Sequence, residues 1–443
     1  MQFKQLFPLL LLAGLLFFSN ASGVLAAPEP EPKLLLLEDA VAISLADNPG
    51  LAAMKTRAEA LATVPSQQGS LPDPRLSLNM MNLPIDSFDF TQEGMTQLQV
   101  GFSQMLPFPG KLALSEAAAE HESTAARWQL EEVRLKLVRD VKTVWWNLYF
   151  TDRALETVAR NVELLRQFVD VAQTKYKVGK GLQQDVLLAQ LELSKLHEQT
   201  IVLRGLRRNQ VAQLNALLDQ PTDGQVQLPQ RVTETFAEIT DEKSLLALAV
   251  RTHPALAVGQ SKIDAARARL GLAKKSYSPD FRLGAVYGYR GGENIDGSSR
   301  DDFLSVTFSM NLPLYAGARQ DKAVDQRTSQ VLQNRYELDD KRSRVAAEVS
   351  RALADYQQSR KQASLFKQGI IPQAAQTVAS MLAGYQVNKV DFLNLVRAQI
   401  TLFNYETRYW KTVSQGNQAL ARLTAAVGKQ SLFDDDNGKN NWN

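Results

Sequence analysis

The fold is decided by residues 130–176, which read LEEVRLKLVRDVKTVWWNLYFTDRALETVARNVELLRQFVDVAQTKY. Mostly apolar side chains recur in this stretch at every seventh residue. The first row is Leu130, Leu137, Val144, Thr151, Val158, Leu165 and Ala172, and the second, four positions behind, is Val141, Leu148, Leu155, Val162, Val169 and Tyr176. Two such rows have the period of 3.5 residues that makes neighbouring helices meet along a left-handed seam.

The predicted helix is very long. No proline interrupts the chain between Pro109 and Pro221, so the helix continues until the run Val178-Gly179-Lys180-Gly181. A helix from Lys111 to Tyr176 is a rod of roughly 100 Å, because each residue adds about 1.5 Å. Such a rod suits a protein that crosses a gap and has no use in a compact enzyme.

Charge and cysteine content exclude several classes of protein. The formal net charge is +3, with basic and acidic residues interspersed. Nucleic-acid binders normally show a basic face, so we expect no nucleic-acid partner. The chain has no cysteine, which excludes disulfides, thiolate metal sites and the lipid-modified N-terminal cysteine of a lipoprotein.

The N-terminus is typical of a secretory signal peptide, which we place at residues 1–26. Lys4 supplies the positive charge, Leu9 to Phe18 the apolar core, and Val24-Leu25-Ala26 the small-residue cleavage site. A membrane anchor is the alternative, but the apolar run is shorter than the about 20 residues that a spanning helix needs. No later stretch is long and apolar enough for a membrane helix, so a membrane-embedded part would have to consist of strands.

Two hairpins are predicted between the helical regions. An amphipathic helix from Leu37 to about Asp47 and a second helix to about Val64 come first. The hydrophobic period then changes to two, which predicts a hairpin at about 73–106 and another at about 280–312, with strands of about ten residues. The alternating residues are Leu76, Leu78, Met80, Leu98, Val100 and Phe102 in the first hairpin and Phe281, Leu283, Ala285, Tyr287 and Tyr289 in the second.

The order of elements repeats after 205 to 209 positions, so we expect two structural repeats. The matching segments are Asn48-Pro49-Gly50-Leu51 with His253-Pro254-Ala255-Leu256, Leu98–Pro107 with Leu304–Pro313, and Tyr176-Lys177-Val178 with Tyr385-Gln386-Val387. We place the first repeat at 27–230, with long helices at about 111–218, and the second at 231–428, with long helices at about 317–428. Residues 429–443 are expected to be a disordered tail.

Four strands cannot close a barrel, and open strand edges cannot face lipid. The strands have a length that crosses a bilayer at a tilt. We therefore expect other copies of the chain to complete the sheet: three copies supply twelve strands, an even number found in outer-membrane barrels. The predicted fold class is thus mainly α with a β-hairpin membrane part, in which a trimeric twelve-stranded β-barrel continues into a coiled-coil α-helical barrel.

Three segments give the chain a family resemblance. They are Gln104–Lys111 (QMLPFPGK), Ile371–Thr377 (IPQAAQT) and Tyr385–Leu393 (YQVNKVDFL). In these segments and over most of its length the chain resembles the TolC-like outer membrane factors, the exit ducts of tripartite efflux and secretion systems in Gram-negative bacteria. The forms LPFPGK and KVDFL look like the heavy-metal branch of that family, the CzcC/CusC type.

The resemblance implies a homotrimer in the outer membrane with a long periplasmic extension. It also implies a periplasmic adaptor that docks at the helix tips and an inner-membrane pump of the RND type. The residues at the two tips are Val178, Gly179, Lys180 and Gly181, and Val387, Asn388 and Lys389. Asn388 departs from the family pattern, because a glycine is usual at its position.

A periplasmic gate is implied just beyond the tips. In TolC-like proteins, aspartates on the helix after the second tip narrow the entrance. Asn394 and Arg397 occupy those two positions here, while Asp185 matches the site after the first tip and Asp391 lies nearby. A mixed ring of aspartate and arginine would close by salt bridges between protomers, whereas an all-aspartate ring would attract cations. Helix N-capping is the alternative role for Asp185.

No catalytic or cofactor site is expected. His121, His197 and His253 are scattered, so no metal site is expected, and no nucleophile or phosphate-loop motif is present. The function expected is a passive exit duct for heavy-metal cations. Export of drugs or organic solutes, or type I secretion, is the alternative within the same fold, and a periplasmic coiled-coil adaptor or scaffold without a pore is the rival from another class.

Overall fold

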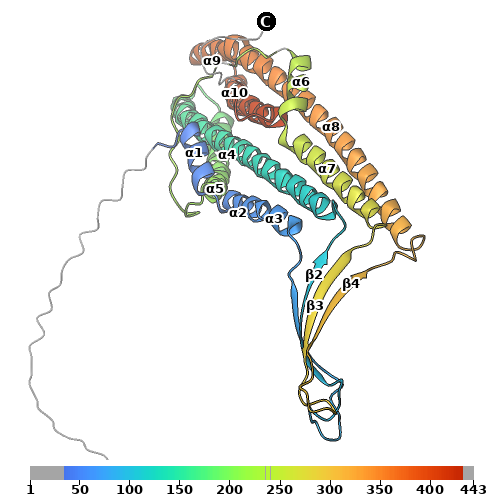
Figure 1. Cartoon of the computed structure of the whole chain (residues 1–443). Coiled ribbons are helices and arrows are strands. Elements are labelled where there is room, and N and C mark those ends of the chain that lie inside the picture. The colour runs from blue at the N-terminus through green and yellow to red at the C-terminus, as the bar shows by residue number, and fades with distance from the viewer. Residues whose placement is uncertain (1–33, 235, 240, 433–443) are drawn as a thin grey trace, which may run out of the picture.

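The computed structural model describes residues 34–234, 236–239 and 241–432. A long helical part continues into a narrow four-stranded sheet (Figure 1). The elements are α1 (Leu37–Asp47), α2 (Pro49–Ala62), α3 (Val64–Gly69), β1 (Arg75–Met81), β2 (Gln97–Leu106), α4 (Lys111–Lys177), α5 (Gln183–Leu217), α6 (Glu242–Thr252), α7 (Pro254–Lys275), β3 (Phe281–Tyr289), β4 (Phe303–Met310), α8 (Gln320–Leu365), the π-helix Phe366–Ile370, α9 (Ile371–Gln386) and α10 (Phe392–Val427). The predicted signal peptide and residues 433–443 of the predicted tail lie outside the described residues.

Helix α4 is the helix that the two heptad rows predict. It is 67 residues long and packs against α1, α2, α3, α5, α7 and α10. Most members of both rows are buried along its seams, including Val141 and Leu148 at 0% exposure. Leu130 and Leu155 are half-buried, and Tyr176 is exposed at 48%, because the seam ends there and the chain turns.

The counterpart of α4 in the second half is not continuous. Its seam residues from Val331 to Ala363 are buried, but five residues of π-helix, Phe366–Ile370, separate α8 from α9. Pro372 follows at once. Its nitrogen cannot donate the usual helical hydrogen bond, and a wider turn accommodates the missing bond. The second helix predicted to about Val64 is α2, which ends at Ala62; a further short helix, α3, follows it to Gly69.

All four strands belong to one antiparallel sheet in the order β1-β2-β3-β4. The strands span 7, 10, 9 and 8 residues, so the prediction of about ten is correct for β2 and long for the other three. Strand β1 ends early because Asn82 turns the backbone into the left-handed region at φ 54°. In the described chain the outer edges of β1 and β4 have no partner strand.

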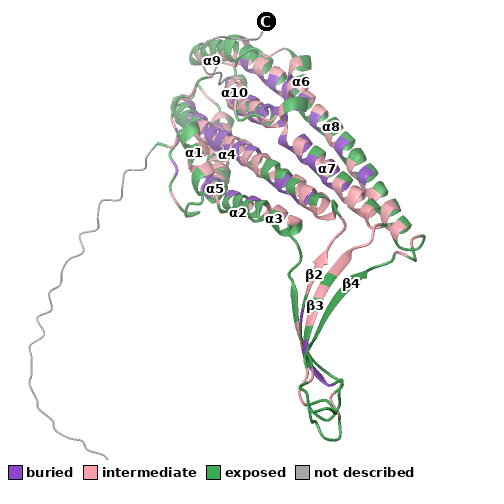
Figure 2. Ribbon diagram, in the orientation of Figure 1, coloured by how far each residue is buried: buried purple, intermediate pink, exposed green. Residues whose placement is uncertain are grey.

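The register gives the sheet two unlike faces. The first, the apolar face, carries exposed side chains on every strand: Leu76, Leu78, Met80, Leu98, Val100, Phe102, Leu283, Tyr287, Tyr289, Leu304, Val306 and Phe308. The second, the polar face, carries mainly small or polar residues: Arg75, Ser77, Asn79, Gln97, Gln99, Gly101, Ser103, Arg282, Gly284, Gly288, Ser305, Thr307 and Ser309. Figure 2 shows that burial is confined mostly to the contacts between helices, whereas the outer strands β1 and β4 are largely exposed and the inner strands β2 and β3 are mostly intermediate.

The sheet joins the helices through one ion pair. The Lys111 Nζ atom lies 2.7 Å from Asp280 Oδ1 and 2.9 Å from the carbonyl oxygen of Ser278. The same Asp280 oxygen accepts a hydrogen bond from the backbone N–H of Phe108 at 2.8 Å. Asp280 therefore fastens the end of β2 and the start of α4 to the start of β3.

The two helical junctions outside the long rods are built alike. Asn48 caps α2 and donates a hydrogen bond to the carbonyl oxygen of Leu217 at 3.2 Å. In the second half His253 caps α7, and Thr252 donates to the carbonyl oxygen of Val427 at 2.6 Å.

Among the described helices, none combines the length and apolar character that crossing a membrane requires.

We predict that Asp280→Ala destabilises the joint between sheet and helices. The substitution leaves the Lys111 ammonium, only 13% exposed, without its carboxylate. A hydrogen bond to a charged group contributes about 1.5–3 kcal/mol, so the free energy of unfolding should fall by roughly 2 kcal/mol. Thermal unfolding in detergent, followed by circular dichroism at the helix band, measures the change. Asp73→Ala is the matched control because Asp73 is exposed; equal melting curves for the two variants would contradict the prediction.

Candidate functional site

The two helix tips lie together at one end of the helical part. One hydrophobic cluster contains Leu165 and Phe168 of α4, Ala189 of α5, Tyr385 of α9 and Leu395 of α10. The α4–α5 turn and the α9–α10 turn therefore form one structural unit, although 209 positions separate Val178 from Val387 in sequence.

The two turns have the same backbone. Gly179 has φ 70° and Asn388 has φ 60°, both in the left-handed region. The N–H of Lys180 donates to the carbonyl oxygen of Lys175 at 2.8 Å, and the N–H of Lys389 donates to that of Gly384 at 2.9 Å. This is the hydrogen bond of a Schellman helix end, and asparagine is the residue after glycine that adopts its left-handed position most readily. Asn388 thus departs from the family residue without changing the turn.

A lysine joins one tip to the other. Lys175 of α4 donates from Nζ to the carbonyl oxygen of Tyr385 and, at 2.6 Å, to Asn388 Oδ1. The same ammonium lies 4.1 Å from the centroid of the Tyr385 ring. The match between the two halves of the sequence does not point to Lys175, because the equivalent position in the second repeat is Gly384. Lys175 acts only in the first repeat.

Asp185 and Asp391 face the same small region. Burial, together with the negative charge of Asp391, raises the pKa of the Asp185 carboxyl, while a hydrogen bond from the Leu182 N–H and the charge of Lys175 oppose the rise. The Leu182 N–H lies just before the first turn of α5, where backbone N–H groups have no partner within the helix. Asp185, the third residue of α5, accepts a hydrogen bond from this N–H through its carboxylate. Asp185 therefore supports the start of α5, although it is not the N-cap residue itself.

The remaining predicted site residues lie on the surface. Asn394 and Arg397 are exposed on α10, three positions apart on one side of the helix. In the described chain neither side chain forms a hydrogen bond or ion pair. The exposed tip residues are Val178, Gly179, Lys180, Val387, Asn388 and Lys389, and Gly181 is half-buried. Each tip thus exposes one apolar side chain, Val178 or Val387, at 62%.

A buried polar pair lies above the tips and was not predicted from the sequence. Gln399 donates to Asn161 Oδ1 at 2.7 Å, and both residues are 3% exposed. Nearby, burial raises the pKa of Glu406, with the Arg160 charge acting in the opposite direction. A polar residue within an apolar heptad stretch is the signal that identifies such a pair, because it fixes the register of two helices.

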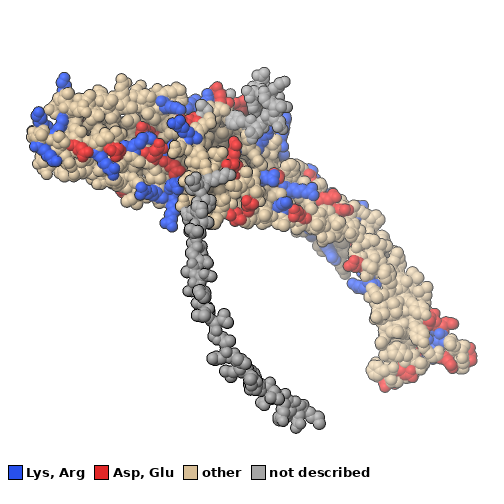
Figure 3. Space-filling view, turned by 90° about the vertical axis from the view of Figure 1, so that its left-hand side faces the viewer, with Lys and Arg blue, Asp and Glu red and all other residues tan. Residues whose placement is uncertain are grey.

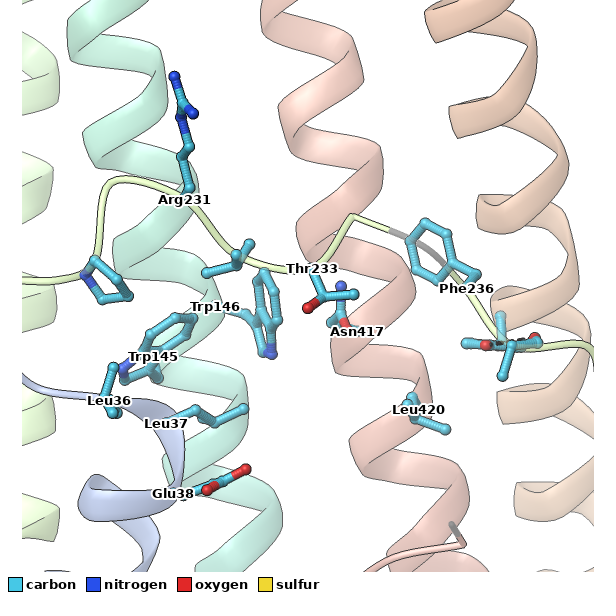
Figure 4. Close-up of a pocket in the computed structure, with 14 residues that line it drawn as sticks. Leu36, Leu37, Glu38, Trp145, Trp146, Arg231, Thr233, Phe236, Asn417 and Leu420 are labelled. Atoms are coloured by element: carbon cyan, nitrogen blue, oxygen red, sulfur yellow. Dashed lines mark hydrogen bonds between the residues drawn. The ribbon is translucent and has the colours of Figure 1, made fainter.

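A groove lies where the linker between α5 and α6 crosses the long helices. Figure 4 shows Trp145 and Trp146 of α4 beneath the linker, with Asn417 and Leu420 of α10 beside them. Trp145 is 1% exposed and stacks on Tyr149 with ring centroids 5.6 Å apart, so packing is its role. Linker carbonyl oxygens accept hydrogen bonds from Arg207, Arg153, Tyr356 and Gln357.

Charges of both signs are mixed on the face of the helical part that Figure 3 draws. Figure 3 shows basic and acidic side chains interspersed over the helical part, while the strands are mostly uncharged and acidic groups gather at their far end. Within the described residues, no group of three or more histidine, aspartate or glutamate side chains could hold a metal ion.

A family model described as outer membrane efflux protein matches residues 41–220 and 245–429. The cobalt-zinc-cadmium resistance protein CzcC of Cupriavidus metallidurans is 22% identical over 424 residues, which cover 93% of this chain and 94% of that protein. Protein CyaE of Bordetella pertussis is 26% identical over 212 residues, covering 47% of this chain and 44% of CyaE.

Solved structures of outer membrane channels have the same fold. VceC of Vibrio cholerae matches with a TM-score of 0.75 at 18% identity, covering 89% of this chain and 96% of VceC. CusC matches with a TM-score of 0.73 at 16% identity, covering 89% of this chain and 92% of CusC. These matches confirm the predicted TolC-like fold class.

We predict that Lys175→Met loosens the second tip. The loss of two hydrogen bonds from a charged group removes roughly 1.5–3 kcal/mol of local stability. The amide of Lys389 should then exchange its hydrogen at least about tenfold faster, because 1.4 kcal/mol corresponds to a factor of ten. Hydrogen–deuterium exchange read by mass spectrometry measures the rate. Lys177→Met is the matched control on the same tip, since Lys177 is exposed; the same exchange rate in both variants would show that Lys175 does not join the tips.

Proposed function

We infer the function of this chain from one premise: it belongs to the outer membrane efflux protein family. As a member of that family it is a channel of the outer membrane and not an enzyme. We propose that it is the exit duct of a tripartite system. In this role the chain conducts substrate passively, and an inner-membrane RND pump supplies the energy.

The single observation that carries the proposal is the incomplete sheet. Four strands with an exposed apolar face and two unpaired edges are unstable alone in lipid, because unsatisfied backbone groups cost several kcal/mol each there. Two further copies satisfy both edges, pairing β4 of one protomer with β1 of the next. A homotrimer then forms a closed barrel whose apolar face contacts outer-membrane lipid and whose polar face lines the duct.

We also propose that residues 27–230 and 231–428 are two copies of one ancestral unit. The matching caps at Asn48 and His253, the matching turns at Gly179 and Asn388, and the symmetric order of the four strands support this division. The signal peptide proposed for residues 1–26 accounts for export to the periplasm.

The helix tips are the proposed docking place for a periplasmic adaptor. Val178 and Val387 are exposed apolar points, and Lys180 and Lys389 beside them are exposed cations. The gate is proposed just inside the tips, where Asp185 and Asp391 of the same chain approach each other. Asn394 and Arg397 are exposed on α10 and face the inside of the ring in the proposed trimer. Arg397 then reaches the carboxylates of a neighbouring protomer.

The proposed substrates are heavy-metal cations. The supporting observation is the resemblance to CzcC, a cobalt-zinc-cadmium resistance protein, over nearly the full length of both chains. Efflux of organic solutes is the second candidate. It is favoured by the lack of a convergent metal-ligand cluster among the described residues.

We predict that deletion of this chain in its host increases sensitivity to cobalt, zinc and cadmium salts. Growth inhibition by graded salts measures the effect, and a plasmid carrying the intact chain should restore growth. An organic dye and a bile salt serve as comparison toxicants. Sensitivity to these alone would replace metals by organic solutes as the substrate, and recovery of the protein as a soluble periplasmic monomer would exclude the duct.

We predict that Arg397→Ala raises the conductance of the trimer in planar bilayers. The substitution removes the cation that would pair with aspartates across the closed entrance. Single-channel recording at low salt measures the conductance. Arg397→Lys is the control, because it keeps the charge. An unchanged conductance in Arg397→Ala would remove this residue from the gate.

A further inference from the structure

On the two inner strands, β2 and β3, the polar face of the sheet is less exposed than the apolar face. Neither face is covered in the chain, yet only polar-face residues bury one another: Gln97 is 5% exposed and Gly101 and Gly288 are buried. Residues on the apolar face of the same strands and of β4 are exposed instead, for example Phe102 at 54% and Leu304 at 73%. Side chains crowd together on the inside of a curve and separate on its outside, so we infer that the sheet curves toward its polar face.

The glycines of the polar face confirm this crowding. A Cβ atom at Gly101 would lie 2.6 Å from Ser77 Oγ and 3.2 Å from Val286 Cγ2. A Cβ atom at Gly288 would overlap the side chain of Gln97. Larger side chains at these positions would displace Ser77 and Gln97, so the polar face is closely filled on the inner strands, and both its packing and its chemistry favour it as the interior face.

The four described strands contain two charged residues, and both are arginines. Arg75 begins β1, and Arg282 is the second residue of β3. Both belong to the polar face at the end of the sheet nearest the helices. Ser103 is the direct register partner of Arg75, and Met105, two residues on, is the partner of Arg282. The four strand sequences contain no aspartate or glutamate to balance them.

Neither arginine is neutralised within the described chain. Arg75 and Arg282 form no side-chain hydrogen bond or ion pair there. Asp280, the acid next to β3, is engaged by Lys111 and the Phe108 N–H. Asp321 accepts a hydrogen bond from Tyr277, and Asp73 is exposed in the loop before β1.

We propose that Arg75 and Arg282 form an anion-favouring ring at the helix-side base of the barrel. This proposal rests on the trimeric duct proposed above, in which three copies bring both arginines to the lumen. Rings of arginine or lysine favour anions in pores, and the interior of a narrow barrel strengthens their potential. The ring favours carboxylates, phosphates and anionic metal complexes over free divalent cations. A metal would then leave the duct in complexed form.

The absence of cysteine from the chain permits a local measurement of this potential. A cysteine in Ser103→Cys lies beside Arg75 on the polar face. In outer-membrane fragments, its rate of modification is measured with negatively charged 2-sulfonatoethyl methanethiosulfonate and positively charged 2-(trimethylammonio)ethyl methanethiosulfonate. The ratio of the two rates reports the potential at the ring and does not depend on the gate at the distant tips.

We expect the ratio of anionic to cationic rates to fall when both arginines are replaced in R75Q/R282Q. A local potential of about 1 kT changes this ratio by about sevenfold, and 1 M KCl should abolish most of the difference. R75K/R282K should keep the wild-type ratio. Asn79→Cys, four residues along β1 on the same face, should change less. An equal ratio with and without the arginines at low salt would overturn the ring.

Two further variants separate failure of the ring from failure of the duct. Phe102→Cys lies on the apolar face next to Ser103, so lipid should protect it from both reagents. Equal labelling of Phe102→Cys and Ser103→Cys would contradict the barrel itself. Thr307→Cys, in the same register row as Ser103, repeats the measurement if Ser103→Cys does not assemble.

Discussion

The seam along α4 is the interaction on which the remaining structure depends. One uninterrupted helix of 67 residues provides the surface against which helices of both halves pack. Its buried rows hold α5 and α10 in place, and through them the two tips. At its other end Lys111 binds Asp280, so the direction of α4 also sets the position of the sheet. Loss of the seam would separate the tips from the strands.

Much of this architecture follows from the sequence because it depends on periodicity. The heptad rows predict α4, and the change to a period of two predicts both hairpins. The duplication indicates that the tips are alike, and the common turn at Gly179 and Asn388 has that form. The family segments add the fold class, which the matching channel structures confirm.

Periodicity cannot predict contacts that depend on one side chain in three dimensions. Lys175 is one member of a charged helix surface in the sequence, yet it spans the space to Tyr385 and Asn388. The Asn161–Gln399 pair likewise joins residues 238 positions apart. The short β1 and the π-helix before Pro372 depend on local backbone geometry, which hydrophobic patterns do not encode. The gate residues on α10 remain a prediction, since their partners belong to other copies of the chain.

The lysine at the tips also bears on stoichiometry. Both turns have one backbone form, but the first contributes a lysine, and its counterpart Gly384 has no side chain. Around the proposed trimer the turns therefore alternate between two chemical kinds. A binding partner that contacts only the backbone would have six equivalent binding positions, two from each of three protomers. A partner that also contacts the side chains would have three positions of each kind. For the proposed adaptor, this difference favours either binding as pairs of unequally placed subunits or leaving every second turn empty.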